Sequence, residues 1–172
     1  ENSLIDDDES SKIRKNIFEL VEKYSKISHK KKEFVPGKSM VPVSGKVFDE
    51  TELQFLISSS LDFWLTSDRF NKEFEKNLSI FLNSAFVLTT NSGSSANLLA
   101  VSALKSKELG KRSLNDGDEV ITVAAGFPTT VNPIIQNNLV PVFVDVKLGS
   151  YGIDETQIEN AISHKTKAIM LA

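Results

Sequence analysis

The residues best suited to chemistry form one short run of small and hydroxyl-bearing side chains. Asn91-Ser92-Gly93-Ser94-Ser95-Ala96-Asn97 follows a β-rich stretch, and the residues after it favour a helix. Small residues let a ligand approach the backbone, and the start of a helix presents unpaired N–H groups at its positive end. Such a loop binds anions, most often phosphate, and the hydroxyls of Ser94 and Ser95 would add donors.

The same run also suits a tight turn with a helix cap, so this stretch alone leaves both interpretations open. It lacks the Lys of a nucleotide P-loop and the three glycines of a dinucleotide-binding loop. Neither ATP nor NAD is therefore favoured as the ligand.

An aromatic side chain is the second candidate. Gly126-Phe127-Pro128 joins a predicted strand to a predicted helix, at the rim of the sheet where the phosphate-type loop is also expected. A flat ring in this place can stack on a flat cofactor. A Phe is more often a core residue, but the flanking Gly and Pro favour a site.

The segment Trp64–Phe70 is the third candidate, because it contains the only Trp of the chain and a cation beside polar groups. Arg69 can pair with a phosphate or a carboxylate of a ligand. The alternative is that Trp64 packs in the core and Arg69 pairs with a local acid. Asp145, at the end of a predicted strand, is either a ligand contact or a turn residue.

Strands that alternate with helices must position these groups. The predicted strands are 86–90, 119–123, 140–146 and 168–171, and the predicted helices between them are 96–104, 128–136 and 154–163. This order predicts right-handed βαβ crossovers and a mostly parallel sheet with helices on both faces, an α/β fold. Ligands of such sheets bind at the carboxyl ends of the strands.

Apolar residues at helical spacing predict three more helices ahead of the sheet. They span Ile13 to Tyr24, Asp49 to Trp64 with Asp49 as the cap, and a segment from about Asn71. We expect 1–40 to be an N-terminal helix and linker, and 41–172 to be the first part of a larger α/β domain. That domain is expected to be incomplete, since the final apolar run predicts a buried strand whose neighbours follow.

Composition excludes several classes of function. The net charge of −3 argues against a nucleic acid or an anionic membrane as partner. The chain has no cysteine, and its two histidines, both expected at the surface, cannot build a metal site alone. No apolar run approaches the roughly 20 residues that span a bilayer, and the acidic start does not fit a signal peptide. A cytoplasmic protein is expected.

Four long motifs together resemble a known family. They are Val41–Lys46, Leu61–Thr66, Leu88–Ala100 and Gly117–Pro133. They are similar to the DegT/DnrJ/EryC1/StrS family of sugar aminotransferases, which uses pyridoxal or pyridoxamine phosphate. Within that family they look most like the branch that removes the C3 hydroxyl of CDP-4-keto-6-deoxyglucose, in the biosynthesis of dideoxyhexoses for lipopolysaccharide O-antigen. The resemblance covers nearly the whole chain, N-terminal helix included.

The resemblance implies a fold-type I PLP-dependent transferase and a homodimer that binds a nucleotide-linked keto sugar. Gly93, Ser94 and Ser95 would hold the cofactor phosphate, and Phe127 would stack on its ring. Thr66 and Arg69 would lie in a loop that faces the sugar or the dimer partner.

The loop departs from the family pattern at one position. Asp68 stands where the family commonly has Gly, which puts the role of Arg69 in question. Asp is among the residues that tolerate a positive φ, if this position requires one.

The catalytic residues are expected beyond Ala172. They comprise an acid for the pyridine nitrogen, a His in place of the usual Schiff-base Lys, and the cysteines of a 2Fe-2S cluster served by a separate flavin/iron-sulfur reductase. A Lys at that position would instead imply a sugar aminotransferase. The third alternative is an inactive, truncated chain that only binds phosphate or pairs with a full-length subunit.

Overall fold

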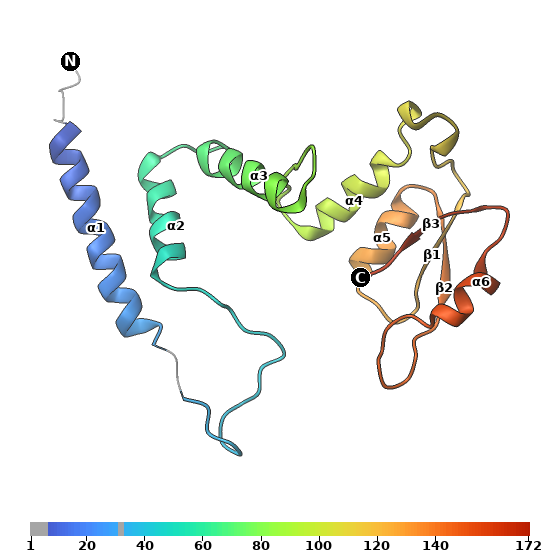
Figure 1. Ribbon diagram of the computed structural model, residues 1–172, viewed down its shortest axis with the longest axis horizontal. Helices are drawn as coiled ribbons and strands as arrows, with labels where there is room; N and C mark the ends of the chain where they lie inside the picture. Colours follow the sequence, from blue (N-terminus) through green and yellow to red (C-terminus); the bar gives the residue numbers. More distant parts are fainter. Residues whose placement is uncertain (1–6, 31–32) are drawn as a thin grey trace. The chain divides into compact units, whose positions relative to one another are not determined.

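The computed structural model describes residues 7–30 and 33–172, and these divide into two compact units, 1–84 and 85–172 (Figure 1). Parts of the predicted acidic start and of the polar segment before Pro36 lie outside the described residues. The predicted domain boundary near residue 40 stays a prediction.

The described residues of the first unit form three helices: α1 (Asp7–Ser28), α2 (Glu50–Asp62) and α3 (Arg69–Leu82). Helix α1 packs against α2, where Gln54 donates from Nε2 to the carbonyl oxygen of Phe18 at 3.3 Å. The three helices predicted from the spacing of apolar residues are therefore confirmed.

Helix α2 begins with a capping box, as its predicted cap requires. The Asp49 side chain accepts from the Thr51 N–H at 2.7 Å, and the Glu52 side chain accepts from the Asp49 N–H, also at 2.7 Å. These two bonds satisfy N–H groups that have no partner within the helix. The start of α2 is therefore fixed locally, whereas the helix ends at Asp62, short of the predicted end near Trp64.

The second unit is built on a three-stranded parallel sheet in the order β2-β1-β3. Strand β1 (Glu119–Val123) pairs with β2 (Val140–Val144) on one side and with β3 (Thr166–Met170) on the other. Helix α5 (Pro128–Gln136) connects β1 to β2, and α6 (Ile158–Ala161) lies between β2 and β3. The chain thus returns past β1 to place β3, which is the doubly wound connectivity of α/β folds.

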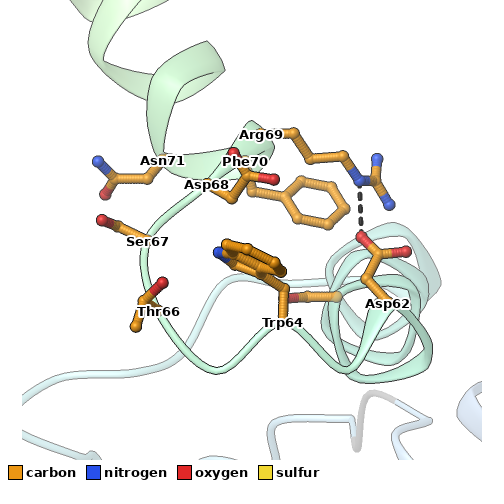
Figure 2. Close-up of a pocket in the computed structure, with 9 residues that line it drawn as sticks. Asp62, Trp64, Thr66, Ser67, Asp68, Arg69, Phe70 and Asn71 are labelled. Atoms are coloured by element: carbon orange, nitrogen blue, oxygen red, sulfur yellow. Dashed lines mark hydrogen bonds and ion pairs between the residues drawn. The ribbon is translucent and has the colours of Figure 1, made fainter.

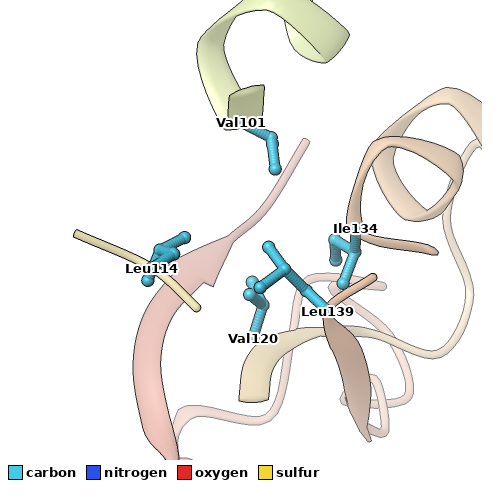
Figure 3. Close-up of a cluster of buried hydrophobic side chains, with 5 residues drawn as sticks. All are labelled: Val101, Leu114, Val120, Ile134 and Leu139. Carbon is cyan, nitrogen blue, oxygen red and sulfur yellow. The ribbon is translucent and has the colours of Figure 1, made fainter. Parts of the chain in front are cut away.

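Helix α4 (Gly93–Ala103) precedes the sheet and packs against α5. The main buried cluster joins these two helices to one face of the sheet (Figure 3). Its members are Val101, Leu114, Val120, Ile134 and Leu139, with Ala168 and Met170 packed against them. Successive strand residues point to opposite faces, so only alternate residues of β1 and β3 join this cluster.

Two predicted elements are wrong or shorter in the structure. Residues 86–90 form no strand, because they lie outside the three paired strands of the described sheet and a strand is defined by its ladder. The predicted helix 154–163 is a 3₁₀ turn, Glu155–Gln157, followed by the single α turn of α6. Extended backbone at Ile162 ends that turn, and so short a helix gains little from propagation.

Candidate functional site

The serine loop caps α4. Ser92 has extended backbone, and its Oγ accepts from the Ser95 N–H at 3.2 Å and donates to the Ser95 Oγ at 3.2 Å. Thr90 Oγ1 donates to the Ser92 carbonyl oxygen at 2.8 Å. The predicted helix cap is confirmed. The capping group is the hydroxyl of Ser92, and the hydroxyl of Ser94 takes no part in it.

The outer side of the loop remains open for an anion. Gly93 and Ser94 are the first residues of α4, so their N–H groups have no acceptor within the helix. Both residues are exposed, and apart from its chain neighbours and the backbone of its own helix, nothing in the described chain lies within 4 Å of the place where a Cβ on Gly93 would stand. The loop therefore fits a phosphate at the positive end of α4.

A hollow of about 270 Å³ lies between α4 and α5, next to this loop. It is lined by Ser94, Ser95, Leu98, Thr129, Asn132, Pro133 and Gln136. Asn97 Nδ2 donates to the carbonyl oxygen of Thr129 at 3.1 Å, which ties α4 to the first turn of α5. The structure thus brings Ser94 and Ser95 to the same hollow as polar groups that follow strand β1.

Phe127 stands at the N-cap position of α5 with extended backbone and makes no side-chain capping bond, and Pro128 follows as the first helical residue. Phe127 is 70% exposed, so it does not belong to the core of this unit. It is not among the residues that line the hollow between α4 and α5. The stacking role of Phe127 stays a prediction.

Thr66 and Arg69 line a second hollow, at the connector 63–68 between α2 and α3 (Figure 2). The other lining residues are Ser59, Asp62, Trp64, Ser67, Asp68, Phe70 and Asn71. Trp64 is 62% exposed here, which contradicts its placement in a core within this unit. We call this space the connector hollow.

Arg69 pairs with a local acid, as one of the two interpretations proposed. Its Nε donates to Asp62 Oδ2 at 2.7 Å, and Nη2 donates to Ser58 Oγ at 2.9 Å. The guanidinium carbon lies 3.9 Å from the centroid of the Phe70 ring, a cation–π distance. Hydrogen bonds from Arg69 and then Arg14 lower the pKa of Asp62. The predicted contact of Thr66 and Arg69 with sugar or partner stays a prediction.

Two acids have plain local roles. Asp68 has a φ of −151°, outside the left-handed region, so the position does not require Gly, and its carboxylate pairs with Lys72 at 2.7 Å. That ion pair lowers the pKa of Asp68. Asp145 is exposed; its Oδ1 accepts from the Val146 N–H at 2.7 Å, and its carbonyl oxygen accepts from the Asp154 N–H at 2.8 Å. The turn interpretation of Asp145 accounts for both bonds.

Arg14 is a further residue of this site, and the sequence motifs did not single it out. From α1, its Nη2 donates to the carbonyl oxygen of Ser58 at 2.6 Å, to Ser58 Oγ at 2.8 Å and to Asp62 Oδ1 at 2.8 Å. The available signal was a cation between Ile13 and Ile17, on the apolar side of a helix that is otherwise charged.

Within the described residues, no cluster of three or more His, Cys, Asp or Glu could hold a metal ion.

The fold is that of the fold-type I PLP-dependent transferases, which its structural neighbours share. An Escherichia coli GDP-4-keto-6-deoxy-D-mannose-3-dehydratase with bound hydrated PLP superposes with a TM-score of 0.66 at 32% identity, over 74% of this chain and 32% of that one. Residues 47–172 match the model of the DegT/DnrJ/EryC1/StrS aminotransferase family, and the chain belongs to this family. The predicted fold class and family are confirmed.

Two relatives resemble the chain over most of its length. The lipopolysaccharide biosynthesis protein RfbH of Salmonella typhimurium is 56% identical over 163 residues, which cover 95% of this chain and 37% of the relative. A dTDP-4-dehydro-2,6-dideoxy-D-glucose 3-dehydratase of Saccharopolyspora spinosa is 46% identical over 139 residues, covering 81% of this chain and 30% of the relative. The chain therefore spans about a third of the length of these relatives.

Proposed function

We propose that the protein removes the C3 hydroxyl of a nucleotide-linked 4-keto-6-deoxyhexose, CDP-4-keto-6-deoxyglucose, with pyridoxamine or pyridoxal phosphate as cofactor. The observation that carries this proposal is the 46% identity, over 81% of the chain, with a sugar 3-dehydratase. The 56% identity with a lipopolysaccharide biosynthesis protein supports a product destined for O-antigen.

The chain's own contribution is to bind and orient the cofactor. The N–H groups of Gly93 and Ser94 and the hydroxyls of Ser94 and Ser95 would hold its phosphate at the positive end of α4. Phe127, exposed at the start of α5, would stack on its ring. When bound, the cofactor supplies an electron sink for the departure of the hydroxyl.

The connector hollow would bind the sugar of the substrate. Thr66 and Trp64 are exposed there and present a hydroxyl and a flat apolar face, a combination that suits a sugar ring. Arg69 would act from the wall of the hollow, where its bonds to Asp62 and Ser58 hold it.

We further propose that the whole protein acts as a cytoplasmic homodimer, with a 2Fe-2S cluster reduced by a flavin/iron-sulfur reductase. The 172 residues contain no cysteine, so the cluster ligands would come from residues outside this sequence. Across residues 7–30 and 33–172, no helix has the length and apolar character to cross a membrane.

A turnover assay tests the reaction. The protein is incubated with pyridoxamine phosphate, CDP-4-keto-6-deoxyglucose and a reductase, and the product is analysed by mass spectrometry. Loss of the C3 oxygen without gain of nitrogen is the expected result.

A sugar aminotransferase is the second candidate, since an Escherichia coli dTDP-4-amino-4,6-dideoxy-D-glucose transaminase is 36% identical over 108 residues. Formation of an amino sugar with glutamate as donor would establish that reaction and overturn the dehydration. A cofactor that binds without either product would leave the inactive binding chain as the function.

A further inference from the structure

Asp62 is shared by two arginines from different helices. Oδ1 accepts from Arg14 of α1 at 2.8 Å, and Oδ2 accepts from Arg69 of α3 at 2.7 Å. Ser58, one turn earlier on α2, also accepts from both guanidinium groups through its Oγ. Two cations and one carboxylate thus form a clamp, Arg14–Asp62–Arg69, at the end of α2.

The clamp closes the ends of the connector. Asp62 is the last residue of α2 and Arg69 is the first of α3, so their ion pair fixes the separation between the two ends of residues 63–68. Phe63 begins the connector in the left-handed region, with φ at 49°, which is unfavourable for a residue with a bulky side chain. A strained turn of this kind persists only where surrounding contacts hold it.

The connector carries the exposed groups of the hollow. Trp64 and Thr66 lie between the clamped ends, and Figure 2 shows the dashed bond from Arg69 to Asp62 beside Trp64. Any loosening of Asp62 would therefore be transmitted to both side chains through a connector of six residues.

Arg14 comes from a part of the chain that the family model does not match. The match begins at residue 47, whereas α1 spans Asp7–Ser28. Of the residues on α1, Arg14 makes three bonds to Ser58 and Asp62, and its side chain is 32% exposed. A bond from a guanidinium to a carboxylate is stronger than one between neutral groups, and it fixes direction as well as distance.

We propose that Arg14 is a positioning residue for the connector hollow. By holding the carboxylate oxygen of Asp62 that Arg69 does not use, it sets the conformation of residues 63–68 and so the placement of Trp64 and Thr66. Helix α1 acts in this way as an accessory to substrate binding. The assignment of the hollow to the sugar rests on the proposed function, whereas the effect of Arg14 on the connector does not.

Two measurements test the effect of Arg14 on the connector separately from the binding of sugar in the connector hollow. The protein is labelled with 5-fluorotryptophan, and the fluorine resonance of Trp64 is identified by its loss in Trp64→Phe. We expect Arg14→Ala and Asp62→Asn each to move this resonance. The double variant should match Asp62→Asn, because that change already removes the carboxylate that Arg14 holds. Lys15→Ala removes a neighbouring, exposed cation of α1 and serves as the matched control.

The kinetic arm measures turnover of CDP-4-keto-6-deoxyglucose. We expect Arg14→Ala to raise KM about fivefold or more and to change kcat by less than about twofold, the pattern of lost substrate binding. Arg14→Lys keeps the charge but loses the forked donors, so it should recover only part of the effect. It also provides the measurement if Arg14→Ala fails to fold.

An unchanged Trp64 resonance in folded Arg14→Ala or Arg14→Lys would overturn the positioning role. A resonance that moves in a protein that does not dehydrate the sugar would sustain the role of Arg14 and remove the proposed function. A resonance that moves while KM stays constant would show that the connector hollow does not bind the substrate, and would overturn the accessory role of α1.

Discussion

Nη2 of Arg14 lies 2.8 Å from Oδ1 of Asp62, although 48 positions separate the two residues in the chain. This bond joins a helix outside the family match to a helix inside it. Asp62 receives a second arginine on its other oxygen, and the hydrogen bonds from Arg69 and Arg14 hold its pKa below the ordinary value of 3.8. The charge state of Asp62 is therefore linked to the stability of the fold.

Acid should weaken the clamp. Because the folded pKa of Asp62 is depressed, its contribution is fully present above its ordinary pKa and is lost as pH falls through the folded pKa. Wild type should be more stable than Asp62→Asn at about pH 7, and this difference should shrink below about pH 4. Urea unfolding of both proteins across this range measures it. A difference that stays constant with pH would contradict the linkage.

Phe63→Gly should stabilise the protein by about 0.5–1 kcal/mol, since glycine adopts the left-handed conformation without the steric cost of a side chain. The matched control is Asn83→Gly at the end of α3, where φ is also 49°. Asn already tolerates this region, so the control should gain less. Midpoints of urea unfolding give both values, and an equal gain at the two sites would argue against strain at Phe63.

Ile134→Ala should destabilise the second unit by about 2–5 kcal/mol, because the side chain is fully buried in the cluster under α4 and α5. Ile135→Ala provides the comparison on the same helix, since Ile135 is 56% exposed. That variant should lose less than about 1 kcal/mol. Thermal or urea unfolding distinguishes the two, and similar losses would place the core elsewhere.

Ser94→Ala should weaken binding of pyridoxamine phosphate by about tenfold, the effect of one hydrogen bond to a charged group. Its stability should be close to that of wild type, because Ser94 is exposed and does not cap α4. Ser92→Ala removes the cap and should cost about 1 kcal/mol of stability. Fluorescence titration and urea unfolding measure the two effects. Unchanged cofactor affinity in Ser94→Ala would remove this residue from the proposed phosphate site.

Local patterns were enough to predict most elements. Strand β1 and helix α5 have the predicted bounds, Glu119–Val123 and Pro128–Gln136, since apolar runs and a proline at the helix start act within a few residues. The cap at Asp49 was predictable for the same reason. The motifs also sufficed for the family, because long uninterrupted matches do not depend on tertiary contacts.

Contacts between distant segments were decided only by the tertiary structure. Residues 86–90 have strand composition but lie outside the sheet, since a strand forms only where a partner supplies the ladder. The exposure of Trp64 and Phe127 depends on which elements cover them, and no local pattern encodes that. The shared use of Asp62 by Arg14 and Arg69 arises because folding brings α1 against α2. The position of Arg14 on the apolar side of its helix marks it as unusual, but its partner lies 48 residues away and no local pattern identifies it.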